Sequence, residues 1–171
     1  MKNKLEGAVA GAGSAAVMKA PHARPAGTDR GAPAPGSAPV RALQRQLVEL
    51  ASARYRANGR FAYHFSRGKL GGDPMFIELL RLGAFTGQRG RGTRFLDLGC
   101  GQAVFASWVI AARTLAEQGG WPADWPEPPR IESVRALELM PADVARGQAG
   151  FAGEPRVRVE QGDICEADFG A

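Results

Sequence analysis

The chain has 171 residues, enough for one domain of ordinary size, and a formal net charge of +5. No run of residues approaches the length of a membrane span, and two distant cysteines do not make a disulfide framework. Glu6 follows the first two lysines and no leucine-rich segment comes after it, which argues against a secretory signal. With only two separate histidines and no metal-ligand cluster, we expect a soluble cytoplasmic protein with free thiols and no metal.

Residues 1–40 are dominated by Ala, Gly and Pro, and we expect a disordered tail there. The tail holds 5 Lys and Arg against 2 Asp and Glu, residues 41–92 hold 10 against 3, and residues 93–171 hold 7 against 12. The basic excess therefore lies in the first half of the chain. A solvated helix face is the favoured explanation, and RNA, an anionic lipid or an acyl carrier are the alternative partners.

Two helices are predicted in residues 41–92. From Arg41 to about Arg56, apolar residues recur at helical spacing, namely Leu43, Leu47, Val48, Leu50, Ala51 and Tyr55. The second helix follows Asp73, a predicted N-cap, with Pro74 in its first turn. Between the two helices, residues 60–70 place three aromatic side chains around a histidine.

That histidine, His64, has two interpretations. Its imidazole could act as a general base near neutral pH. The favoured alternative is an imidazole packed between Tyr63 and Phe65, in the seam between a helical lid and the core. Nothing in the sequence places it near a reacting atom.

Residues 94–103 are the most informative run of the chain. An apolar strand carries Asp97 at its end and then turns through Gly99 and Gly101 into an amphipathic helix. The glycines remove Cβ atoms where a ligand must approach the backbone, and they permit positive φ in the turn. The dinucleotide pattern G-x-G-x-x-G fails, because Val104 stands at its third glycine. A turn with a carboxylate suits a ligand that bears an ammonium group, whereas the alternative is a corner without a ligand.

The helix after this turn keeps one apolar face, as expected for a helix that lies on a sheet. Its N-terminus would present free N–H groups at the turn. Residues 118–130 then contain glycines, prolines and two tryptophans, which predicts a surface excursion. We expect Trp121 and Trp125 to pack back onto the domain, and contact with a substrate or partner is the alternative.

Two further apolar strands end on acids. Residues 133–139 predict a strand that closes on Glu138, and residues 156–164 predict one that closes on Asp163. Because parallel strands bring their carboxyl ends to one edge of a sheet, we expect Asp97, Glu138 and Asp163 around one crevice. Taken singly, Glu138 could cap the following helix and Asp163 could be a turn residue.

The run from Asp97 through Gly99 and Gly101 to Ala103 resembles motif I of the class I S-adenosylmethionine-dependent methyltransferases, in which a third glycine usually stands at the last position. The resemblance covers about half of the chain, from Gly92 to the end, and implies S-adenosyl-L-methionine as cofactor. It implies an amino-group contact for the acid of the turn, a ribose contact for Glu138, and adenine contacts beyond the second and third strands. The cofactor-binding residues that it implies are Asp97, Gly99, Cys100, Gly101, Glu138, Leu139, Asp163 and Ile164.

We expect an α/β protein in which residues 93–171 form a partial Rossmann-like parallel sheet of about three strands. Residues 41–92 would form a helical lid segment in front of it. The family's domain has about twice as many strands, so the resemblance implies only its first half, apparently truncated, and leaves the activity of this chain alone open. Three strands would also leave the motif I strand at an open edge, where it invites pairing with another chain.

The function implied by the resemblance is methyl transfer to a small or lipid-like molecule, by in-line positioning of the acceptor against the sulfonium carbon. No catalytic base is assigned. The alternative is a non-catalytic binding module that works through the basic helical segment, with nucleic acid as its partner. A nicotinamide-dependent reductase is disfavoured by Asp97 and Val104.

Overall fold

The computed structural model describes residues 36–86 and 92–167, so the predicted tail lies largely outside the described residues. Its last residues are the exception. Helix α1 spans Ala38–Ala53, and the tail boundary predicted at residue 40 is therefore slightly too late. Pro39 lies in the first helical turn, where its fixed φ is favourable, and Val40 is already buried in the apolar face.

Three more helical elements follow α1 within residues 36–86. They are the short 3-10 helix η1 (Arg56–Asn58), α2 (Arg60–Gly72) and α3 (Pro74–Arg81). The N-cap prediction for α3 is confirmed, because the Asp73 carboxylate accepts a hydrogen bond of 3.0 Å from the Met75 amide. The apolar face predicted for α1 is confirmed except at Leu50, which is exposed.

Helix α2 was not predicted, since residues 60–70 were assigned only an aromatic cluster. Its buried side is narrow and consists of small residues with one leucine, namely Ala62, Ser66 and Leu70. These residues stand four apart, so they form one stripe along the helix. The larger aromatic residues Phe61 and Phe65 point the other way and are exposed.

The sheet has three parallel strands in the order β1-β2-β3 (Thr93–Leu98, Ile131–Glu138 and Val157–Gln161). Helices α4 (Val104–Glu117) and α5 (Pro141–Gly150) form the crossovers between them. The α/β class and the open three-stranded parallel sheet are thus confirmed. Among the described residues β1 pairs only with β2, as expected for an edge strand.

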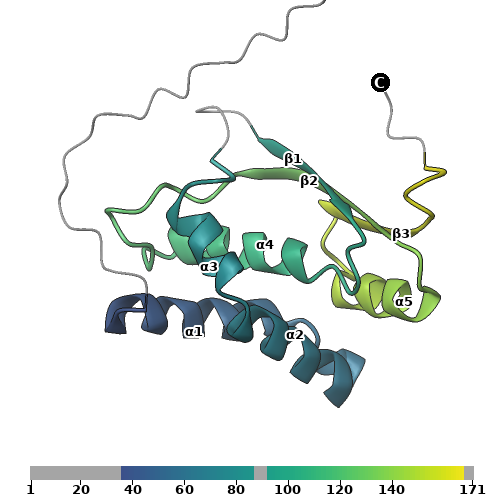
Figure 1. The fold of residues 1–171 in the computed structure, drawn as a ribbon, viewed down its shortest axis with the longest axis horizontal. Helices are drawn as coiled ribbons and strands as arrows, with labels where there is room; N and C mark the ends of the chain where they lie inside the picture. The colour runs from purple at the N-terminus through teal and green to yellow at the C-terminus, as the bar shows by residue number, and fades with distance from the viewer. Residues whose placement is uncertain (1–35, 87–91, 168–171) are drawn as a thin grey trace, which may run out of the picture.

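All of the helices lie on one side of this sheet (Figure 1). Helix α4 lies directly against the sheet, and α1 packs on the outer side of α4. Trp108 in the middle of α4 is fully buried and meets the Phe76 ring edge to face at 5.8 Å. The core therefore runs continuously from the sheet through α4 to α1 and α3.

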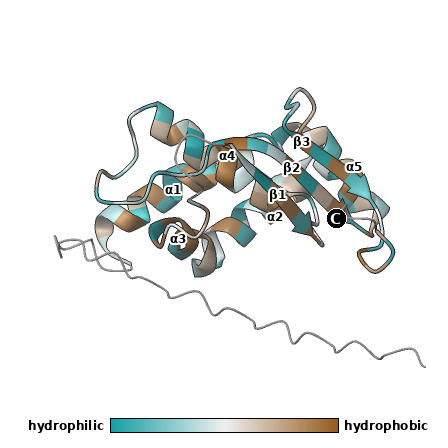
Figure 2. Cartoon of the chain, turned by 90° about the horizontal axis from the view of Figure 1, so that it is seen from above, coloured by the Kyte–Doolittle hydropathy of each residue, from teal (hydrophilic) through white to brown (hydrophobic). Residues whose placement is uncertain are grey.

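The other side of the sheet has no helix over it in the described part of the chain (Figure 1). Alternation along β1 turns Phe95 and Asp97 toward α4 and leaves Leu96 and Leu98 on the bare side, where they are 46% and 45% exposed. Figure 2 looks down on this side, where brown apolar and teal polar residues occur along the same strands. Purely parallel sheets are usually covered on both faces, so the bare side is unusual.

The tryptophan loop packs as predicted. Trp125 is buried, and Trp121 is half-buried against the same core. The two rings meet edge to face at 5.9 Å, and the Trp121 indole N–H donates to the Pro126 carbonyl at 3.0 Å. Two glycines follow the end of α4, and four prolines stand between them and β2. Within the described ranges, no helix combines the length and apolar composition that a bilayer crossing requires.

Candidate cofactor-binding site

The glycine turn after β1 is held to β2 through its backbone. The amides of Gly99 and Cys100 both donate to the Leu137 carbonyl, at 2.9 and 3.0 Å. Gly99 has a φ of +69° and Gly101 a φ of +55°, the left-handed region that glycine adopts without strain. Ala103 also has a positive φ, of 58°, which for alanine costs roughly 1 kcal/mol. The turn thus carries some strain at the position where the resembled motif has its third glycine.

The glycines of this turn face open space. A Cβ atom built on Gly99 or Gly101 would meet no other group within 4 Å. Close packing therefore does not explain why glycine stands at these two positions, whereas their positive φ does. The open space is available to a ligand that approaches the backbone.

Asp97 lies beside the turn with an unsatisfied carboxylate. Its Oδ2 atom is buried and has no hydrogen-bond partner within the described part of the chain. Burial raises the pKa of Asp97 to about 6, and the negative charge of Glu138 adds to the increase. The two acids predicted for this site are therefore close enough to influence each other.

Glu138 binds the turn itself. Its Oε2 atom accepts from the Gly101 amide at 2.8 Å, and its Oε1 atom accepts from the Met140 amide at 2.9 Å. The carboxylate thus joins the glycine turn to the residue just before α5. A carboxylate offers about four acceptor sites, so Glu138 retains capacity for ligand hydroxyl groups.

Cys100 is buried within the turn as a protonated thiol. Burial raises its pKa to about 12, and the charges of Asp97 and Glu138 contribute. Since the thiolate is the reactive form, Cys100 is not a nucleophile in this environment. Both cysteines are free, as predicted, and Cys165 is exposed.

The end of β3 lies next to the end of β2. The Gly162 amide donates to the Glu138 carbonyl at 3.1 Å, and the Gln161 side chain donates to the Leu139 carbonyl at 3.4 Å. Leu139 and Ile164, both predicted cofactor contacts, are exposed at this edge. The edge is therefore shared by all three strands.

Asp163 is at the same edge, but it lines a hollow that includes neither Asp97 nor Glu138. Its Oδ1 atom accepts from the Cys165 amide at 2.8 Å, which is the turn role considered as the alternative. The hollow beside it, of about 310 Å³, is also lined by Arg135 and Glu160, whose ion pair is on the bare side of the sheet. The structure thus brings Asp97, Glu138 and the glycine turn together, and places Asp163 nearby but apart from them.

Tyr55 and Gln102, which the sequence did not assign to the site, connect the glycine turn to the helices around it. The Tyr55 hydroxyl is fully buried and donates to the Gln102 carbonyl at 2.8 Å. The Gln102 side chain donates to Asp143 of α5 at 3.2 Å. Tyr55 was expected only as part of an apolar helix face, and no local signal pairs it with a residue 47 positions later.

His64 lies away from the seam that was predicted for it. The residue is exposed, and its ring contacts Tyr63 edge to face at 5.3 Å. The prediction of a packed imidazole between lid and core is therefore wrong, because α2 turns this position to solvent. A catalytic role for His64 has no support from its contacts.

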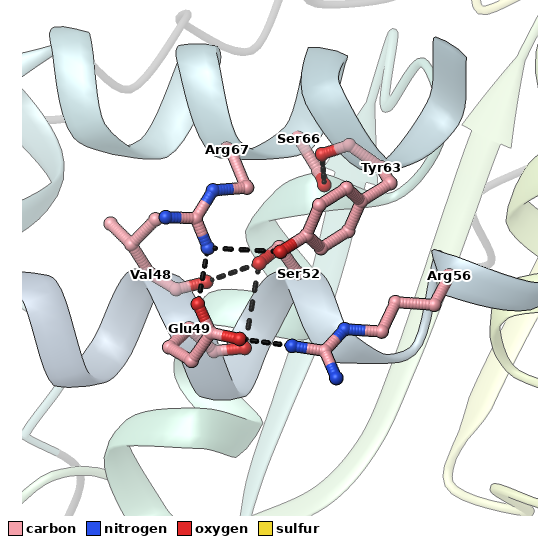
Figure 3. Close-up of polar contacts among 7 residues, drawn as sticks. All are labelled: Val48, Glu49, Ser52, Arg56, Tyr63, Ser66 and Arg67. Carbon is pink, nitrogen blue, oxygen red and sulfur yellow. Dashed lines mark hydrogen bonds and ion pairs between the residues drawn. The ribbon is translucent and has the colours of Figure 1, made fainter. Parts of the chain in front are cut away.

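A hollow of about 510 Å³ lies between α1 and α2 and includes none of the predicted cofactor residues. Glu49 stands at its wall and forms ion pairs with Arg56 and Arg67 (Figure 3). Arg67 also donates to the Tyr63 hydroxyl at 3.2 Å. This cluster joins the two helices and accounts for Glu49 and Arg67 in the hollow without a ligand.

Within the described residues, no group of three or more potential ligands could hold a metal ion. Comparison of the chain with protein-family models, with curated proteins and with solved structures finds no match.

Proposed function

We propose that the chain binds S-adenosyl-L-methionine. It is a methyltransferase, or the cofactor-binding part of one, that acts on a small or lipid-like molecule. The observation that carries the proposal is the unpartnered Oδ2 atom of Asp97 beside an open glycine turn. A buried carboxylate oxygen without a donor is unfavourable, and the ammonium group of a ligand would stabilise it.

The start of α4 supports the same ligand. The helix has no side-chain hydrogen bond at its N-cap, Ala103, so its first N–H groups are not capped by a side chain. Helix N-termini favour anions, and this one begins at the glycine turn. An amino acid moiety, with both an ammonium and a carboxylate, matches Asp97 and the helix terminus together.

In this proposal the cofactor supplies an electrophilic methyl group when bound. Asp97 holds the amino group, Glu138 keeps the turn in place and accepts from the ribose, and the open glycines allow close approach of the ligand. These residues bind and orient, and the rate of transfer then depends on how the acceptor is positioned. No residue of the chain is assigned as a base.

Calorimetry with S-adenosylmethionine and S-adenosylhomocysteine tests the proposal. We expect both to bind the full chain, and Asp97→Asn and Glu138→Gln to weaken binding by at least about tenfold, the loss of one charge-assisted contact. Glu132→Gln is the matched control, because Glu132 is an exposed acid at the other end of the same strand. No heat from a folded sample, or equal affinity for Asp97→Asn, would contradict the proposal. Binding of NAD in place of these ligands would favour the reductase alternative.

A further inference from the structure

We propose that the exposed face of α2 formed by Phe61, His64 and Phe65 docks onto a lipid bilayer that contains anionic lipids. This aromatic face is separate from the glycine turn, and the proposal does not depend on methyl transfer.

The aromatic face follows from the geometry of α2. Its three residues stand at positions i, i+3 and i+4, while Ala62, Ser66 and Leu70 are buried on the opposite side. Phe61 is 63% exposed and Phe65 is 43% exposed. Exposure of the apolar surface of two adjacent phenylalanines to water costs free energy. Their transfer into an apolar environment is therefore favourable.

Two arginines lie next to the aromatic face. Arg146 of α5 lies over the Phe61 ring, 5.1 Å from its centroid, and Arg60 precedes it on α2. Residues 36–86 hold eight Lys and Arg against three Asp and Glu. All three acids are ion-paired, Glu49 with two arginines, Asp73 with Lys69 and Glu78 with Arg81, and the segment keeps a net positive charge. Cations near an anionic bilayer surface are attracted to it, so the segment is complementary to such a surface.

The arrangement of the rings favours a bilayer over a nucleic acid. Phe61 and Phe65 stack on each other, with centroids 6.0 Å apart and planes at 18°, and Arg146 lies over Phe61. A nucleic-acid base needs a free ring face for stacking, and these contacts occupy the faces of Phe61. A bilayer interior needs only apolar surface, which the two exposed phenylalanines provide.

Co-sedimentation of the full chain with vesicles tests the proposal. We expect binding to vesicles of phosphatidylcholine with phosphatidylglycerol, much weaker binding to phosphatidylcholine alone, and a decrease with added salt. The double variant Phe61→Ser/Phe65→Ser should lose at least about tenfold in partition coefficient. The variant Phe61→Leu/Phe65→Leu should keep most of it, because leucine also inserts into a bilayer. Leu82→Ser is the matched control, since Leu82 is an equally exposed apolar residue outside this face (67%).

Four results would overturn the proposal. The first is no sedimentation with anionic vesicles, and the second is equal sedimentation of the serine double variant, with its fold verified by circular dichroism. The third is a chain whose aromatic face is covered by a second copy, seen as a dimer by light scattering that the serine double variant abolishes. Binding of single-stranded RNA that is lost in the leucine variant as in the serine variant would also replace the bilayer as partner.

Discussion

At the scale of single residues, Asp97 determines how ligand binding should depend on pH. Its carboxyl has a pKa of about 6, and a ligand ammonium requires the ionised form. We expect the dissociation constant for S-adenosylhomocysteine to rise about tenfold between pH 7.5 and pH 5, because protons then compete for this group. Calorimetry across this range measures it. Glu132→Gln should show the same slope, and a flat profile for the unchanged chain would contradict the role of Asp97.

The same carboxylate should destabilise the fold at neutral pH. The pKa of Asp97 is raised from 3.8 to about 6, so its contribution to stability is favourable in acid and is lost as the pH rises through 6. We expect Asp97→Asn to raise the free energy of unfolding by on the order of 2 kcal/mol at pH 7.5. Urea denaturation at pH 7.5 and pH 4 measures this, and the gain should vanish at pH 4. A destabilised variant at pH 7.5 would argue that Asp97 already has a partner.

Tyr55 should matter through its hydroxyl group alone. Tyr55→Phe leaves the buried Gln102 carbonyl without its donor, which costs about 1–3 kcal/mol of unfolding free energy. Tyr63→Phe is the matched control, because the Tyr63 hydroxyl is at the surface and accepts from Arg67. Urea denaturation compares the two variants. Similar small losses in both would show that the bond to the turn contributes little.

At the scale of elements, two substitutions can separate the effect of backbone strain on stability from the effect of lost space on ligand binding at the glycine turn. Gly101→Ala and Gly119→Ala both place alanine at positive φ with no neighbour within 4 Å, so each should cost roughly 1 kcal/mol of stability. Only Gly101 faces the proposed ligand. We therefore expect Gly101→Ala alone to weaken S-adenosylhomocysteine binding, as measured by calorimetry. Equal affinities for the two variants would place the ligand elsewhere.

The elements that the sequence predicts best are those with strong local signals. The strands that end near Asp97 and Glu138 are short segments with recurring apolar residues, followed by turns or helices. Their parallel pairing follows from the alternation of strand and helix. The N-cap at Asp73 has an equally local signal. The contact between the glycine turn and Glu138 was expected as a shared edge, although the direct bond to the Gly101 amide was not.

The parts that the sequence does not predict depend on contacts between distant residues. Helix α2 was missed because its buried side is made of Ala62, Ser66 and Leu70, which give a weak apolar pattern beside exposed aromatics. The bond from Tyr55 to Gln102 depends on how α1 packs on α4. Asp163 lines a hollow together with Arg135 and Glu160. Alternation along the strands turns these two side chains to the bare side of the sheet.

At the scale of the whole molecule, the bare side of the sheet and its open edge should make the chain self-associate. Leu96 and Leu98 are exposed on an edge strand, where unpaired backbone groups and apolar side chains favour strand pairing. We expect the double variant Leu96→Thr/Leu98→Thr to reduce association with little loss of stability, because threonine keeps β propensity. Light scattering as a function of concentration measures this. Unchanged association would place the contact on another surface.

The burial of α4 between the sheet and α1 has a consequence for cooperativity. Nine residues of α4 are buried, from Val104 to Leu115, and they contact elements from both halves of the chain. Neither the helices before residue 92 nor the strands after it can come apart without exposing this helix to water. The whole assembly should therefore melt in one transition, with near-ultraviolet and far-ultraviolet signals that change together.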